Sequence, residues 1–108
     1  MVARAFFDTI RTLGFAGISP AYASVGVAFA FTGRAMRLVN ATAGDMMFTN
    51  DTAVDKIFVK AGDSVMWNIQ SNENPKFDDS YVLPIGTQIS VKQVTAPVSG
   101  AVYVEVIY

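Results

Sequence analysis

With 108 residues, the chain is long enough for one domain built around a single hydrophobic core. It contains no Cys and no His, which excludes disulfides, thiolate zinc sites and a Cys nucleophile, and removes the commonest general base. The net charge of −1 provides no basic field for nucleic acid. Only 16% of the residues are charged, against about 25% in an average soluble domain. The composition therefore predicts no cofactor, no metal and no enzyme, and favours assembly with other chains.

The first third of the chain carries almost no charge. Residues 12–33 are uncharged, which is long enough for a membrane-spanning helix. Pro20 and four glycines interrupt this stretch, and residues 27–31 place aromatic and branched side chains at a period of two, which is typical of a strand. Asp8 and Arg11 break up any apolar core of a secretory signal peptide. The sequence therefore predicts neither a membrane span nor a leader, and a strand at residues 27–31.

Residues 1–33 are interpreted as an apolar, Gly- and Ala-rich N-terminal arm that precedes a β-sandwich domain at residues 34–108. Aromatic and aliphatic side chains near the start are spaced as on a short helix. A free arm of this composition exposes apolar surface, so we expect it to reach away from the domain, or along its edge, and dock on a neighbouring subunit. Met46 and Met47 are adjacent, so a strand directs one of them away from the core. The candidate interface residues are Phe6, Phe7, Ile10, Phe15 and Met47.

From residue 34 onward, short apolar runs alternate with turn residues, the pattern of an all-β protein. Strands are predicted at residues 35–40, 46–49, 55–60, 64–70, 81–83, 88–94 and 101–108. With the strand at residues 27–31, the total is about eight. In the last strand, Val102, Val104, Val106 and Tyr108 share one face. The pattern predicts a small β-sandwich or jelly roll of about eight antiparallel strands.

Two kinds of residue invite a functional interpretation. Trp67 is the only Trp and suits sugar stacking, but Val65 and Ile69 share its face of the predicted strand, which favours a place in the core. The acidic residues at 51 and 55, and those at 73, 78 and 79, lack the alternating oxygen ligands and turn-forming Gly of a calcium loop. No spacing identifies the carboxylate pair of a glycosidase. We therefore predict no catalytic residues and no metal ligands.

Four segments resemble small virion structural proteins of tailed bacteriophages. They are residues 37–48 (RLVNATAGDMMF), 55–59 (DKIFV), 91–93 (VKQ) and 96–108 (APVSGAVYVEVIY), within a similarity that covers residues 35–108. The resemblance implies a β-sandwich or jelly-roll protein that decorates or cements an icosahedral capsid. Small β modules of this kind also serve at the head–tail connection. The resemblance brings no active-site residues with it.

The expected function is therefore that of a capsid decoration or cement protein in the virion, which binds the major capsid protein and itself. Its partners are neighbouring virion subunits, with neither nucleic acid nor a membrane involved. A head–tail adaptor, or another neck or tail structural protein, is the nearest alternative. A carbohydrate-binding module that uses Trp67 and the tyrosines is an alternative from another class, and a hydrolase with a carboxylate pair is a third.

Overall fold

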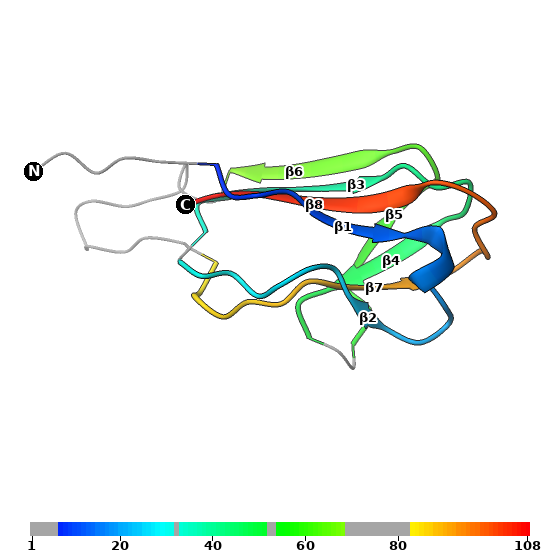
Figure 1. Cartoon of the computed structure of the whole chain (residues 1–108), viewed down its shortest axis with the longest axis horizontal. Helices are drawn as coiled ribbons and strands as arrows, with labels where there is room; N and C mark the ends of the chain where they lie inside the picture. The colour runs from blue at the N-terminus through cyan, green and yellow to red at the C-terminus, as the bar shows by residue number, and fades with distance from the viewer. Residues whose placement is uncertain (1–6, 32, 52–53, 69–82) are drawn as a thin grey trace, which may run out of the picture.

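The computed structural model describes residues 7–31, 33–51, 54–68 and 83–108. In this part of the chain, two four-stranded antiparallel sheets pack face to face (Figure 1). Sheet A has the strand order β1-β8-β3-β6, and sheet B has the order β2-β7-β4-β5. The strands are β1 (Arg11–Gly14), β2 (Ala23–Ser24), β3 (Ala35–Asn40), β4 (Met46–Thr49), β5 (Ile57–Val59), β6 (Ser64–Asn68), β7 (Ser90–Gln93) and β8 (Ala101–Ile107). The predicted all-β class, with about eight antiparallel strands, is confirmed.

The central strands form where the sequence alternates most regularly. In β8, Val102, Val104 and Val106 are buried, whereas the residues between them lie on the outer face of sheet A. β8 pairs with β3 along its whole length, from Ala35 opposite Ile107 to Asn40 opposite Val102. The core fills the space between the two sheets. Its members are buried aliphatic and aromatic side chains: Ile18, Val25, Phe29, Met36, Leu38, Met46, Phe48, Val59, Ile89, Val91, Val102, Val104, Val106 and Tyr108.

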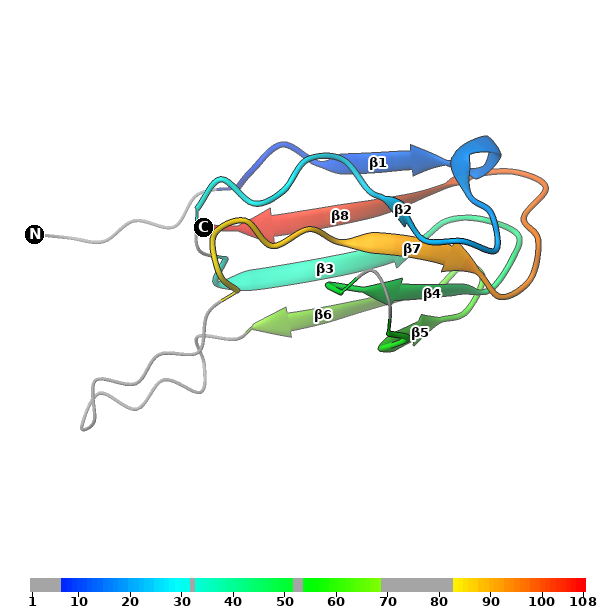
Figure 2. The same ribbon diagram turned by 90° about the horizontal axis from the view of Figure 1, so that it is seen from below.

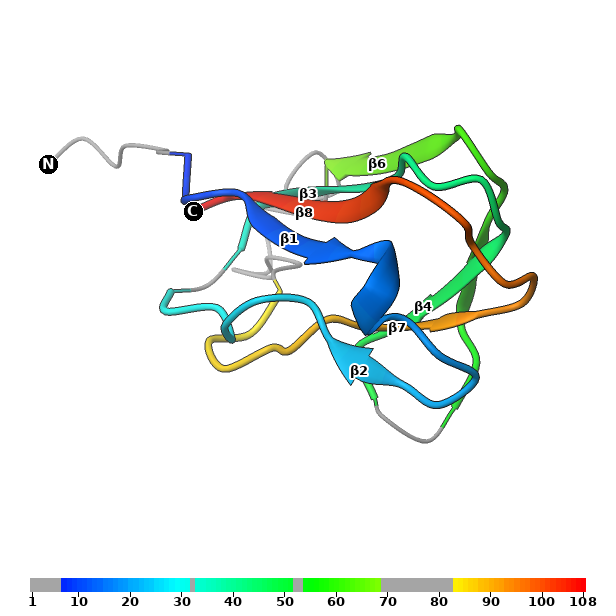
Figure 3. The same cartoon turned by 45° about the vertical axis from the view of Figure 1, so that its right-hand side comes forward.

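The described part of the predicted N-terminal arm belongs to the sandwich, which corrects the expected boundary at residue 33. β1 pairs with β8 and is an edge strand of sheet A, and β2 pairs with β7 and is an edge strand of sheet B. The short 3-10 turn η1 (Phe15–Gly17) begins the crossing between them (Figure 3). Ile18, Val25 and Phe29 are core residues. The reason is packing: each sheet gains its fourth strand, and the core gains three apolar side chains, from this segment.

A buried polar network holds this segment in place. The Arg11 side chain is directed between the sheets and is only 4% exposed. Its guanidinium lies 2.7 Å from the Asp8 carboxylate, and its Nε donates to the Val27 carbonyl at 2.7 Å. The Tyr108 hydroxyl accepts from the Arg11 Nη2 and donates to Asp8 Oδ2 at 2.6 Å. These hydrogen bonds satisfy a charge that burial alone disfavours, and they tie the two ends of the chain together.

Three local predictions differ from the structure. The helical spacing expected near the start of the chain is replaced from Arg11 onward by the strand β1. Arg11 and Leu13 point inward as strand residues, opposite Val104 and Val102. Residues 27–31 form no strand: Phe29 is buried whereas Val27 and Phe31 are exposed, and the backbone of Phe29 makes isolated hydrogen bonds to the Gly86–Thr87 turn. Of residues 81–83, Leu83 forms a single bridge with Gly33, and the other two lie outside the described residues.

The buried side-chain amide of Asn40 organises the turn between β3 and β4. The Asn40 side chain donates to the carbonyls of Gly44 (2.8 Å) and Val59 (2.9 Å), and its oxygen accepts from the backbone and the hydroxyl of Thr42. Gly100 completes the packing with φ +89°, and an added Cβ there would lie 2.1 Å from the Ala41 carbonyl oxygen. Only glycine fits this backbone conformation and this close approach.

Candidate docking surface

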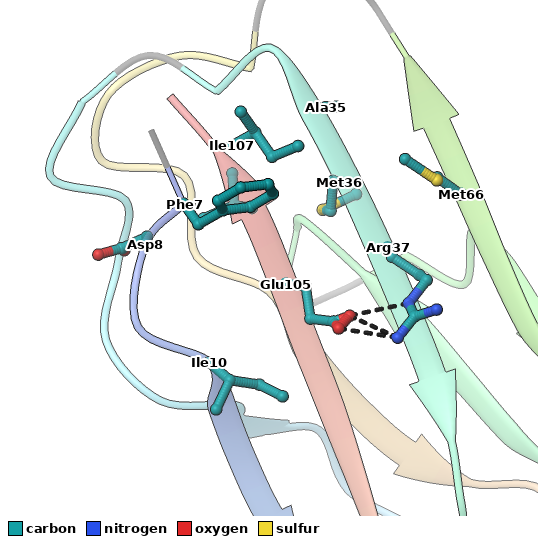
Figure 4. A pocket seen from close by; sticks show the side chains of 10 residues that line it. Phe7, Asp8, Ile10, Ala35, Met36, Arg37, Met66, Glu105 and Ile107 are labelled. Atoms are coloured by element: carbon teal, nitrogen blue, oxygen red, sulfur yellow. Dashed lines mark hydrogen bonds and ion pairs between the residues drawn. The ribbon is translucent and has the colours of Figure 1, made fainter. Parts of the chain in front are cut away.

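The outer face of sheet A carries an apolar groove of about 330 Å³, called the sheet A groove below (Figure 4). Side chains from the segment before β1 and from β3, β6 and β8 surround it. Its apolar lining includes Phe7, Ile10, Ala35, Met36, Met66 and Ile107. Phe7 lies beside β8 because it forms a β-bridge with Ile107, and Asp8 donates its backbone N–H to the Val106 carbonyl. The groove therefore joins residues from both ends of the sequence.

Three of the apolar side chains that line this groove are open to solvent, whereas Ala35 and Met36 at its floor are buried. Phe7 is 84% exposed and Met66 is 63% exposed, and Ile10 is half exposed. Scattered apolar residues are normal on protein surfaces, but apolar side chains that gather around one hollow mark a docking site. This arrangement suits burial against another macromolecule.

One ion pair supplies the polar part of the groove. Arg37 donates from Nε and Nη2 to the two carboxylate oxygens of Glu105, each at 2.8 Å, across the β3–β8 ladder. Figure 4 shows this pair directed toward one another at the edge of the apolar cluster. A bidentate pair has a fixed geometry, so it orients a partner's hydrogen-bonding groups more than it adds binding energy.

Of the five candidate interface residues, the structure brings two together. Phe7 and Ile10 line the sheet A groove. Phe15 is exposed on η1, toward the opposite end of β1. Met47 is half-buried on sheet B, opposite Phe58 and Lys92, so it belongs to a different face. Phe6 lies outside the described residues.

The groove also uses residues that the sequence reasoning did not select. Arg37, Glu105, Met66 and Ile107 all line it. Met66 is the apolar residue between Ser64 and Asn68 on an otherwise polar face of β6, and Ile107 follows Glu105 at a spacing of two on the outer face of β8. An apolar residue on this polar strand face was the sequence signal that could have pointed to Met66.

The outer side of sheet B carries a second polar cluster. The Tyr22 hydroxyl donates to Asp55 Oδ1 at 2.6 Å, and Lys92 Nζ lies 2.7 Å from the same oxygen and 5.0 Å from the centre of the Tyr22 ring. The hydrogen bond to Lys92, followed by that from Tyr22, lowers the pKa of Asp55. Burial, reinforced by the Asp55 carboxylate, raises the pKa of Tyr22 to about 12. The cluster fixes the segment before β2 against β7.

The raised pKa of Tyr22 predicts a distinct step in an alkaline titration. Because the folded state keeps this phenol protonated, it binds more protons than the unfolded state between about pH 10 and about pH 12. The free energy of unfolding should therefore fall across that window. Absorbance at the tyrosinate band should show one tyrosine titrating near pH 12 in the wild type. This step should be missing in Tyr22→Phe and present in Tyr103→Phe; its persistence in Tyr22→Phe would contradict the assignment.

Trp67 faces the interior, as the sequence predicted, but it is half-buried rather than fully buried. It packs against the core with Val65 and lines a smaller hollow of about 210 Å³ between the sheets, beside Met36, Phe48 and Ile57. The burial is incomplete because β6 is the edge strand of sheet A. Ile69, the third residue predicted on this face, lies outside the described residues.

The acidic residues bring no metal site together in the described segments. No group of three or more acidic side chains there is placed to hold a metal ion. Asp55 is engaged by Lys92 and Tyr22. The acidic residues at 73, 78 and 79 lie outside the described residues. Within the described segments, no helix has the length and apolar character needed to cross a bilayer.

Comparisons with family models, with curated proteins and with solved structures find no match to this chain.

Proposed function

We propose that the protein is a structural virion protein of a tailed bacteriophage, which decorates or cements the head by docking the sheet A groove on the major capsid protein. The observation that carries the docking part is the gathering of Phe7, Ile10 and Met66 around one exposed hollow. The virion part is supported by the resemblance of residues 35–108 to small phage structural proteins. The protein acts by binding, without catalysis.

The energetics of the groove favour docking. Burying a large apolar side chain that is exposed in the free protein contributes about 1.5–3 kcal/mol. Phe7 is the most exposed large apolar side chain in the described residues and is anchored by its bridge to β8, so little backbone freedom is lost when it is covered. A partner that covers Phe7 and Met66 together gains enough to offset part of the cost of association. Phe7 is therefore the expected anchor of the contact.

The position in the particle distinguishes the decoration protein from a neck protein, and the burial of Trp67 bears on the carbohydrate-binding alternative. A head–tail adaptor or other neck protein would use the same groove on a different ring of subunits, so only the position in the particle distinguishes it. A carbohydrate-binding module depended on an accessible Trp67, but this side chain packs on the inner face of sheet A. The geometry therefore favours a structural protein.

The docking proposal predicts that Phe7→Asp weakens binding to phage heads that lack this protein. Loss of one apolar anchor should lower the affinity roughly tenfold to a hundredfold, corresponding to about 1.5–3 kcal/mol. Co-sedimentation of purified protein with such heads measures this. Val98→Asp is the matched control, because Val98 is 76% exposed on the loop before β8 and lies outside the groove.

Equal binding by Phe7→Asp and the wild type would overturn the groove as the contact. Failure of the wild type to bind any part of the virion would overturn the function itself. Electron microscopy of particles carrying labelled protein would separate the two virion proposals, because label over the facets indicates decoration and label at one vertex indicates the neck.

A further inference from the structure

The four edge strands of the sandwich differ in how well they resist pairing with another chain. β2 has two residues, and β5 has three and is bracketed by Lys56 and Lys60. β1 directs the charged Arg11 inward and is followed at once by the η1 turn. Short strands, flanking lysines and inward-pointing charges are the usual means of protecting a sheet edge. β6 has none of them: its five residues read Ser-Val-Met-Trp-Asn, without a charge or a proline.

The backbone of β6 offers hydrogen-bonding groups at this edge. In an antiparallel ladder, hydrogen-bonded and non-hydrogen-bonded residue pairs alternate. The Asn40 N–H donates to the Asp63 carbonyl, so these two residues form a hydrogen-bonded pair. The next pair, Val39 opposite Ser64, is therefore non-hydrogen-bonded. The pair after it, Leu38 opposite Val65, is hydrogen-bonded again. By the same alternation, the N–H and C=O of Ser64 and Met66 point away from β3. Among the described residues, β3 is the one strand that pairs with β6.

We propose that β6 binds the β6 strand of a second copy of this chain, antiparallel and about a two-fold axis that passes beside Met66. Met66 is the middle residue of β6 as described, and its backbone groups face the edge, so this register is centred on Met66. Met66 then lies opposite Met66 of the second copy, and Val65 lies opposite Trp67 of the second copy. The two copies of sheet A join into one eight-stranded sheet, in the self-complementary arrangement that a two-fold axis requires.

Charge placement suits this occupant. β6 is uncharged, and the nearest charged side chain on its outer face is Arg37, opposite Met66 on β3. Arg37 is neutralised by its bidentate pair with Glu105, and three strand spacings, about 14 Å, would separate it from its counterpart in the second copy. β5 lies on the same side of the sandwich as β6 (Figure 2), and its flanking lysines keep the two copies of sheet B from pairing as well.

The β6–β6 pairing does not depend on the proposed function, but it would strengthen the proposed docking on a capsid. Met66 belongs both to β6 and to the sheet A groove, so a dimer brings two grooves to the same outer face of one continuous sheet. Two docking sites on one rigid body bind a repeating lattice more strongly than one, because the second contact forms at a high effective concentration.

Sedimentation equilibrium of the full chain tests the pairing. The wild type should be a dimer. Met66→Lys should shift the protein to monomer, with at least a tenfold weaker association, because two lysines would lie directly opposite each other across the axis. Met66 is exposed, so this variant should keep the circular dichroism spectrum of the wild type. Phe58→Lys on β5 is the matched edge-strand control and should remain dimeric.

Amide hydrogen exchange gives a second readout that a dimer formed through other surfaces would not produce. The Met66 N–H should be protected at concentrations where the protein is dimeric and should exchange rapidly on dilution, whereas the Val65 N–H should be protected in both cases. A monomeric wild type, a dimer that survives Met66→Lys, or rapid exchange of the Met66 N–H within the dimer would each overturn the proposal. Loss of head binding in Phe7→Asp with the dimer intact would show that the two proposals stand separately.

Discussion

A chain that lacks residues 2–24 should be unfolded. The deletion removes β1 from sheet A and β2 from sheet B, together with the core residue Ile18 and the buried Arg11. It leaves β8 and β7 with open edges and leaves the gap between the sheets uncovered on that side. A small domain has a stability of only about 5–15 kcal/mol, less than the loss of two strands and their contacts. Far-UV circular dichroism and the dispersion of amide proton resonances measure the result.

A point variant within the deleted segment serves as the control for this truncation. Phe15→Ser changes an exposed side chain on η1 and should leave the folded state intact. A truncated chain that unfolds cooperatively near the wild-type midpoint would show that residues 2–24 are dispensable to the sandwich. The sequence alone favoured that outcome, so the experiment separates the interpretation as an arm from the observed architecture.

Asn40→Leu should reduce the free energy of unfolding by about 4 kcal/mol. The substitution keeps the number and branching of the side-chain heavy atoms but leaves the carbonyl of Val59 and the N–H of Thr42 without the partners that the amide provides. Each buried polar group left without a partner costs about 1–3 kcal/mol. Leu also cannot bond to the Gly44 carbonyl or the Thr42 hydroxyl, so the turn between β3 and β4 loses its internal support.

Urea denaturation monitored by the fluorescence of Trp67 measures this loss. Asn50→Leu is the matched control, since Asn50 is exposed in the next turn, and it should change the stability by less than about 0.5 kcal/mol. A cost below about 1 kcal/mol for Asn40→Leu would mean that the hydrogen bonds of Asn40 are replaceable.

The strands that the sequence located best are those with regular alternation and clear turns at both ends. β3 and β4 begin and end at the predicted residues, because the Thr, Gly and Asp residues between them favour a turn. The alternation of β8 placed Val102, Val104 and Val106 on one face of the strand, and this face is buried in the structure. These features depend on residues that are close together in the chain.

β1 and β2 escaped prediction because their signals come from distant residues. Arg11 points inward, which breaks the expected rule that a charge faces solvent. It is tolerated because Tyr108, 97 positions later, shares its hydrogen bonds with Asp8. The Asp8 carboxylate accepts hydrogen bonds from Tyr108 and Arg11, and these bonds lower its pKa, with Tyr108 making the larger contribution. No local pattern contains this compensation.

The candidate surface was predictable only in part, for a similar reason. Phe7 and Ile10 stood out as apolar residues beside a charge-poor segment, and both line the sheet A groove. Phe15 and Met47 have the same character, but the fold places them on other surfaces. The partners that complete the groove, Arg37, Glu105 and Met66, come from three strands whose neighbours in space are far apart in sequence.

The position of β8 has a consequence for biosynthesis. Of the eight strands in the described residues, β8 is synthesised last, yet it lies at the centre of sheet A, between β1 and β3. Neither neighbour has its full pairing surface until residues 101–107 have emerged, so sheet A cannot close before then. Folding then depends on contacts between the two ends of the chain, which are slow to form. Chains that stop before β8 consequently keep β1 and β3 unjoined, with unpaired strand edges that are prone to aggregation.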